Sequence, residues 1–161
     1  MSENLNELEG GMKRRSVIKA AAWAAPVVAV AVSAPIAAAS GEPPAAVYAG
    51  LGGPATPPKV GENATFRGWG EDAHRDTPAT LQQGTIFTLT FTNGATASQG
   101  TLTGLTLFSG DPTAGGVVEY VVSADTSAQV VIRLSNVQPE GGVITLTSSM
   151  GGSVPTTIQA A

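Results

Sequence analysis

The sequence predicts an all-β protein: a small antiparallel β-sandwich of seven or eight strands, preceded by a helical signal segment. Three observations predict it. Runs in which apolar and polar residues alternate recur between turn signals roughly every 10–15 residues. The chain is rich in glycine and proline, with 20 and 11 residues, while only 12% of its residues are charged. Beyond residue 60 there is no helical pattern of useful length, and 161 residues suit one ordinary domain.

The chain divides into three predicted parts. Residues 1–39 form the signal segment, residues 40–60 a leader rich in proline and alanine, and residues 61–161 the β-sandwich domain. Proline restricts the leader to extended conformations, so we expect at most one short strand in it, near Val47–Leu51. Met12 is an alternative start to Met1.

The signal segment contains a basic cluster that begins at Lys13, and an export motif overlaps this cluster. The motif reads Arg14, Arg15, Ser16, Val17, Ile18, Lys19. Two arginines, a polar residue, two apolar residues and a lysine resemble the twin-arginine signals of Gram-positive, actinobacterial-type secreted proteins. The resemblance implies export of an already folded protein, with the twin-arginine translocase and signal peptidase as partners. The absence of cysteine agrees, because no disulfide has to form outside the cell.

Small residues mark the end of the signal. Ala37 and Ala39 stand at the two positions that a signal peptidase contacts, so the expected scissile bond is Ala39–Ser40. The alternative is an uncleaved anchor, since the uncharged run Ala20–Gly41 spans about 22 residues, just enough to cross a membrane. Its many alanines and the interruptions at Pro26 and Pro35 favour cleavage. We therefore expect a secreted or cell-surface protein, with single-pass anchoring as the alternative.

The predicted strands follow in order, and alternation assigns their buried faces. They are Asn63–Trp69, Gly84–Gly94, Thr101–Phe108, Gly116–Ala124, Ala128–Val137, Val143–Ser149 and Val154–Ala160. The residues expected in the core are Phe87, Leu89, Phe91, Val130, Ile132, Leu134, Ile144 and Leu146. Val118, Tyr120 and Val122 share one face of their strand, and Val117, Glu119 and Val121 share the other. Asn93-Gly94 is a strong turn signal, and Pro155 predicts an edge strand or a strand beginning.

The number and spacing of these strands resemble an immunoglobulin-like or fibronectin-like module in architecture only. The chain has no cysteine and hence no disulfide, so no functional residue of those families carries over. A jelly roll or a small open barrel is the alternative fold.

One polar cluster stands out, beside Trp69. It contains Glu71, Asp72, His74, Arg75 and Asp76. Its carboxylates and the single histidine suit a metal site or acid–base catalysis. Against this, the spacing matches no calcium loop, and one histidine without cysteine makes a weak zinc site. We expect a solvated loop with Trp69 packed against the rim of the core, and neither catalytic residues, metal nor cofactor.

Rows of threonine suggest a second surface. Thr88, Thr90 and Thr92, Thr101 and Thr103, and Thr145 and Thr147 would form a flat hydroxyl face for ice, glycan or wall polymer if they were coplanar. Threonine is, however, simply favoured on the wet face of a strand, which is the interpretation we prefer.

The function expected from the sequence is that of an exported, non-enzymatic binding or structural module for a protein or an envelope polymer. The net charge of −4 argues against nucleic acid as a partner. The alternatives are a membrane-anchored ectodomain and a secreted hydrolase or metal-dependent enzyme that uses the cluster Glu71–Asp76.

Overall fold

The computed structural model of the chain describes residues 43–161. The twin-arginine motif, the cleavage site Ala39–Ser40 and the helical signal segment lie outside the described residues and stay predictions. Within residues 43–161, no helix is long and apolar enough to cross a membrane.

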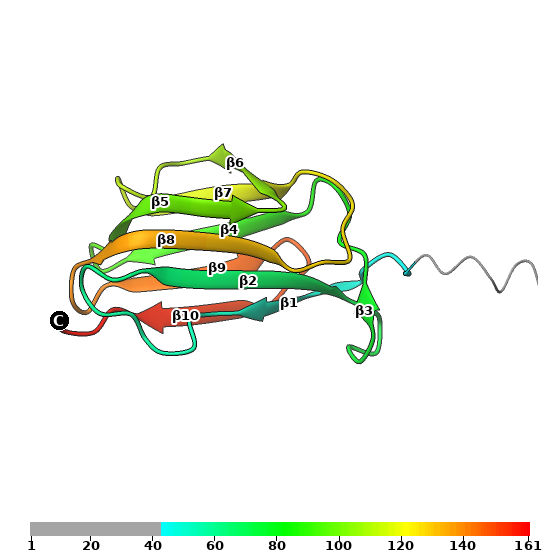
Figure 1. Cartoon of the computed structure of the whole chain (residues 1–161), viewed down its shortest axis with the longest axis horizontal. Helices are drawn as coiled ribbons and strands as arrows, with labels where there is room; N and C mark the ends of the chain where they lie inside the picture. Colours follow the sequence, from blue (N-terminus) through cyan, green and yellow to red (C-terminus); the bar gives the residue numbers. More distant parts are fainter. Residues whose placement is uncertain (1–42) are drawn as a thin grey trace, which may run out of the picture. The chain divides into compact units, whose positions relative to one another are not determined.

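The described residues form two antiparallel sheets stacked face to face, so the predicted β-sandwich is confirmed (Figure 1). The first sheet has the order β1 (Tyr48–Gly52), β2 (Ala64–Glu71), β8 (Val130–Gln138) and β5 (Thr96–Thr103), and β3 (Pro78–Ala79) pairs with β2. The second has the order β10 (Ser153–Thr157), β9 (Val143–Ser148), β4 (Ile86–Thr92), β7 (Gly116–Val122) and β6 (Leu105–Ser109).

The described residues contain ten strands, so the prediction of seven or eight was too low. The main reason is that the run Thr101–Phe108 is not one strand. Gly104 has a φ of 69°, a backbone conformation that breaks the strand, and the chain passes there from β5 in the first sheet to β6 in the second. The two-residue β3 is too short to leave a pattern in the sequence.

The segment 43–60 belongs to the sandwich. Its one strand, β1, is where the sequence predicted it, and it pairs along its whole length with β2. Two isolated bridges, Ala45 with Thr80 and Lys59 with Gln159, fix the segment on either side of β1. This pairing makes β1 the edge of the first sheet, next to β2.

The core lies between the two sheets, and every residue that alternation assigned to it is buried. Phe66 and Leu81 join it with no exposed surface. Tyr120 of β7 is also fully buried, and its hydroxyl donates a 2.7 Å hydrogen bond to Gln99 Oε1 on β5 of the opposite sheet. The buried phenol therefore has a partner, and it links the two sheets by a polar contact.

Local signals at turns and edges were also confirmed. Asn93 and Gly94 both have positive φ, as the predicted tight turn after β4 requires. Pro155 lies in β10, which is an edge strand. A proline in a central strand would leave a gap in the hydrogen-bond ladder.

Candidate functional site

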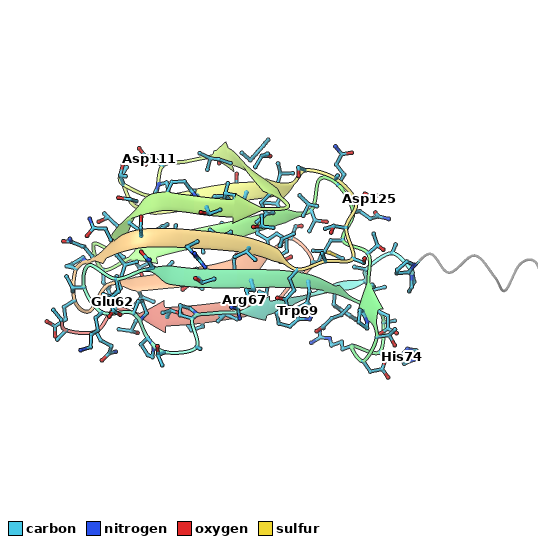
Figure 2. All side chains as sticks on the ribbon, in the orientation of Figure 1. Glu62, Arg67, Trp69, His74, Asp111 and Asp125 are labelled. Carbon is cyan, nitrogen blue, oxygen red and sulfur yellow. The ribbon has the colours of Figure 1, made fainter. Side chains whose placement is uncertain are left out.

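Trp69 lies on the outer face of the first sheet. Along β2 the buried residues alternate with more exposed ones: Phe66 is in the core, Arg67 is exposed, and Trp69 follows two positions later on the same side as Arg67. Figure 2 shows Arg67 and Trp69 side by side along this strand. The expectation that Trp69 packs against the rim of the core was wrong, because the period of two places it on the opposite face.

The Trp69 indole is held flat across the neighbouring edge strand. Trp69 is directly opposite Gly50 in the β1–β2 ladder, and a β-carbon at Gly50 would overlap the indole atoms Nε1 and Cε2. A β-carbon at Gly52 would lie 3.5 Å from the other end of the ring, at Cζ3. The ring therefore covers the backbone of β1 over two glycines that share its face of the sheet.

A hydrogen bond fixes the orientation of the ring. Trp69 Nε1 donates to Glu71 Oε1 over 2.9 Å, and Glu71 is on the same face two residues further along β2. The indole N–H is thereby satisfied, and the ring has one side against β1. What remains free for a ligand is the other side of the ring together with the second carboxylate oxygen of Glu71.

The predicted loop after β2 is a hydrogen-bonded turn. The Asp72 carboxylate accepts from the backbone N–H of His74 over 3.0 Å, and the Asp72 N–H donates to the carbonyl of Thr77 over 3.1 Å. Partial desolvation acts to raise the pKa of Asp72, but hydrogen bonds from the turn lower it by more, so it lies below its ordinary value of 3.8. These donors are the backbone N–H groups of His74, Asp76 and Arg75 and the side chain of Thr77.

Arg75 turns back from this loop toward β1. Its backbone has a φ of 63°, and its guanidinium carbon lies 4.2 Å from the centre of the Tyr48 ring, within the range of a cation–π contact. Tyr48 is paired with Glu71 in the β1–β2 ladder. The contact therefore brings the loop against the same strand pair that carries Trp69.

A shallow hollow of about 170 Å³ lies between the Trp69 ring and the turn. It is lined by Trp69, Glu71, Arg75, Asp76, Thr77 and Pro78. A second hollow, of about 260 Å³, lies at the other sheet edge and is lined by Thr96, Ala97, Ser98, Thr113, Asn136 and Gln138. Only the first combines an aromatic face with charged groups, so we take the Trp69 surface (Trp69, Glu71, Arg75 and the hollow beside them) as the candidate site.

The structure brings Glu71, Arg75 and Asp76 of the predicted polar cluster around the hollow, whereas Asp72 and His74 do not line it. Glu71 bonds to Trp69, Asp72 is engaged in its own turn, and Asp76 accepts from the Thr77 hydroxyl over 3.0 Å. The His74 side chain is 83% exposed, with Nδ1 3.9 Å from Asp72 Oδ2, and it projects from the loop (Figure 2). Across residues 43–161, no three His, Cys, Asp or Glu side chains gather as metal ligands.

The threonine rows are divided between the two sheets. Thr88 faces Thr147 and Thr90 faces Thr145 across β4 and β9, on the outer side of the second sheet. Thr101 and Thr103 lie on β5, in the first sheet. The rows therefore do not form the single flat surface that a common hydroxyl face would need.

Tyr48 and the two glycines of β1 were not predicted from the sequence as part of a site. The sequence did contain a signal: glycine occurs at every second position both in Tyr-Ala-Gly-Leu-Gly and in Gly-Trp-Gly-Glu. In the observed register, this places the Trp69 ring opposite Gly50, which has no side chain. The pairing of β1 with β2, however, is a tertiary fact.

Comparison of the chain with protein-family models, with curated proteins and with solved structures found no match. The geometry of the Trp69 surface therefore carries the functional inference.

Proposed function

We propose that this chain is an exported, non-enzymatic binding module that attaches to an envelope polymer at or beyond the cell surface. The observation that carries the proposal is the Trp69 ring, held flat on the outer face of the first sheet beside an open polar hollow. Rings that present one face while their polar atom is already paired are suited to binding a flat apolar surface.

The glycine at position 50 supports a binding role. A strand is weakened by glycine, because glycine loses more backbone entropy on ordering and contributes no side chain to the sheet. Gly50 is useful here because it lets the indole lie close to the backbone, where a β-carbon would overlap Nε1 and Cε2. The result is a rigid ring that needs little further ordering when a ligand arrives, which favours affinity.

The arrangement of the polar groups supports binding rather than catalysis. General acid–base chemistry needs titratable groups directed at one reacting position. Here Asp72 and Asp76 are hydrogen-bonded within the turn, and the His74 side chain is 83% exposed to solvent. These groups position the loop and line a surface.

The export part of the proposal rests on the sequence. Arg14 and Arg15 begin the twin-arginine motif, and cleavage after Ala39 would release a chain that starts at Ser40. Such a product would keep all of residues 43–161 and thus both sheets and the Trp69 surface.

We also propose that the sandwich is immunoglobulin-like, on the basis of strand order. If β1, β2, β8 and β5 are strands A, B, E and D, and β4, β9 and β10 are C, F and G, both sheets have the order of a constant-type domain. The hairpin β6–β7 is then an insertion between D and E that extends the second sheet beyond β4. No disulfide joins the sheets, because the chain has no cysteine.

Two measurements test the proposed function. The intact mass of the native protein, recovered separately from medium and from washed membranes, should show a soluble species beginning at Ser40. Full-length chain found only in membranes would overturn cleavage and support the tethered ectodomain.

The second measurement is retention of purified protein on envelopes isolated from the producing cell. We expect saturable retention that survives protease treatment of the envelopes. No retention would contradict the binding role, and loss after protease treatment would identify a protein partner in place of the polymer.

A further inference from the structure

We propose that the Trp69 surface binds a neutral pyranose unit of an envelope polysaccharide, with the C–H face of the sugar stacked on the free side of the indole. This inference rests on the proposed function and specifies its ligand. It follows from the geometry of the ring, the size of the hollow and the charges around it.

The geometry of the ring selects a flat ligand. One side of the indole lies against β1 over Gly50, and Nε1 is bound to Glu71, so only the opposite side is available. The C–H groups on one face of a pyranose form a flat apolar patch that matches this single open side. The hydroxyl groups of the sugar point outward from the edge of its ring, so they need polar partners beside the indole once they leave water.

The hollow supplies such partners. Glu71 has one carboxylate oxygen that is free of the Trp69 bond, and Asp76 and Arg75 line the same space. A sugar hydroxyl both donates and accepts, so it pairs with a carboxylate and with a guanidinium. A purely apolar ligand would leave these groups unpaired as it covered them.

The size of the hollow points to a single ring of a longer chain. Its volume of about 170 Å³ is below the roughly 300–1,000 Å³ of pockets that enclose a whole drug-sized ligand. A site that is shallow and open can hold one residue of a polymer while the chain continues on both sides over the sheet.

Charge favours a neutral sugar. The lining of the hollow has two carboxylates, Glu71 and Asp76, against one cation, Arg75, which is already stacked on Tyr48. Arg67 is exposed on the same face of β2, but it does not line the hollow. The part of the chain from Ser40 onward has four basic and nine acidic residues, 4 − 9 = −5. A carboxylate or phosphate of an anionic polymer would be repelled inside the hollow by its excess of carboxylates, and the polymer as a whole by the net negative charge of the chain.

Tryptophan fluorescence tests the proposal directly. The chain has two tryptophans, so the full chain carrying Trp23→Phe retains Trp69 alone. This protein is titrated with the neutral oligosaccharides tetra-N-acetylchitotetraose, maltotetraose and mannotetraose, and with tetragalacturonic acid as the anionic probe. We expect a saturable change in Trp69 emission, and heat in calorimetry, with at least one neutral probe and not with the anionic one.

Variants locate the binding. Trp69→Ala should weaken calorimetric affinity at least about tenfold, as loss of an aromatic stacking contact does. Trp69→Leu still covers β1 with an apolar side chain but has no flat face, so it should weaken the affinity to the same extent. This variant replaces Trp69→Ala in the test if Trp69→Ala fails to fold. The matched control is Thr90→Ala on the outer side of the second sheet, which should bind as the parent does.

The possible outcomes separate this inference from the proposed function. Absence of binding to all neutral probes, equal affinity in Trp69→Leu, or tighter binding of the anionic probe each overturns the pyranose site. If Trp69→Leu is nevertheless retained on isolated envelopes like the parent, the binding role stands and its surface lies elsewhere. Absence of envelope retention in the parent contradicts the proposed function itself.

Discussion

Gly50 and Trp69 are directly opposite each other on β1 and β2, and the Trp69 indole occupies the space that a β-carbon at Gly50 would need. The missing side chain of Gly50 thus leaves the space that the Trp69 ring fills. Because the ring also donates to Glu71, its position is set from both sides, by a close backbone approach and by a hydrogen bond. This pair of constraints distinguishes the Trp69 surface from an exposed aromatic side chain that is free to turn.

Gly50→Ala should displace the ring. The added methyl overlaps Nε1 and Cε2, so the indole must move off β1 and lose its bond to Glu71. We expect a red shift of Trp69 emission in the Trp23→Phe background and a loss of about 1–3 kcal/mol in the free energy of unfolding by urea. Gly52→Ala is the matched control, since its methyl would lie 3.5 Å from Cζ3, an ordinary contact. Equal spectra for the two variants would contradict the stacked geometry.

Alkaline pH should destabilise the fold through Tyr120. Burial raises the pKa of this phenol to about 12 from 10.0, so between these values the unfolded chain releases a proton that the folded chain keeps. The contribution of this group to stability is then constant below pH 10 and falls as the pH rises toward 12, by at most about 2 kcal/mol, because its hydroxyl meets the exposed Gln99 and is partly screened by solvent.

The test of Tyr120 compares urea unfolding of the parent and Tyr120→Phe from pH 8 to pH 12. At pH 8 the variant should be less stable by about 1 kcal/mol, because Gln99 Oε1 loses its hydrogen-bond donor. Its further decline at alkaline pH should be smaller than that of the parent. Parallel declines would show that another group is responsible.

The Asp111 turn should show a depressed carboxyl pKa. The Thr113 hydroxyl donates to Asp111 Oδ1 over 2.7 Å and the Thr113 N–H over 2.8 Å, and these two bonds hold the pKa of Asp111 below 3.8. Thr113→Val removes the hydroxyl bond, so an NMR titration should place the pKa closer to its ordinary value. The depressed pKa contributes stability above the unfolded-state pKa, and this is lost as the pH falls through the folded-state pKa. An unchanged titration in Thr113→Val would exclude the hydroxyl as a cause.

Leu89→Ala should be severely destabilising. Leu89 of β4 is completely buried between the sheets, and removing its side chain leaves a cavity in the core. We expect a loss of about 2–5 kcal/mol in urea unfolding. The neighbouring Thr90→Ala, on the outer face of the same strand, should cost less than about 1 kcal/mol. Similar losses for the two variants would mean that the alternation along β4 does not separate core from surface.

Alternation determined the fold class and the core. Apolar residues occur at every second position from Phe87 to Phe91 and from Val118 to Val122, and these residues are buried. In an antiparallel sheet this spacing indicates a strand with one buried face and one exposed face. Signals of backbone conformation were equally local, as at Asn93 and Pro155. The break at Gly104 was missed, because glycine is tolerated inside a strand as well as between strands.

The polar cluster beside Trp69 was also legible in the sequence, since its residues are adjacent in the chain. Export through the motif that begins at Arg14 stays a prediction. The arrangement of the site depends on pairing between strands. No local pattern shows that β1 lies beside β2, or that Gly50 is opposite the Trp69 ring. The register of two strands is fixed only when both sheets bury their apolar faces. The sequence alone thus determined a two-faced β-protein with a tryptophan near acids. Tertiary structure decided that this tryptophan faces outward, over glycine and beside a hollow.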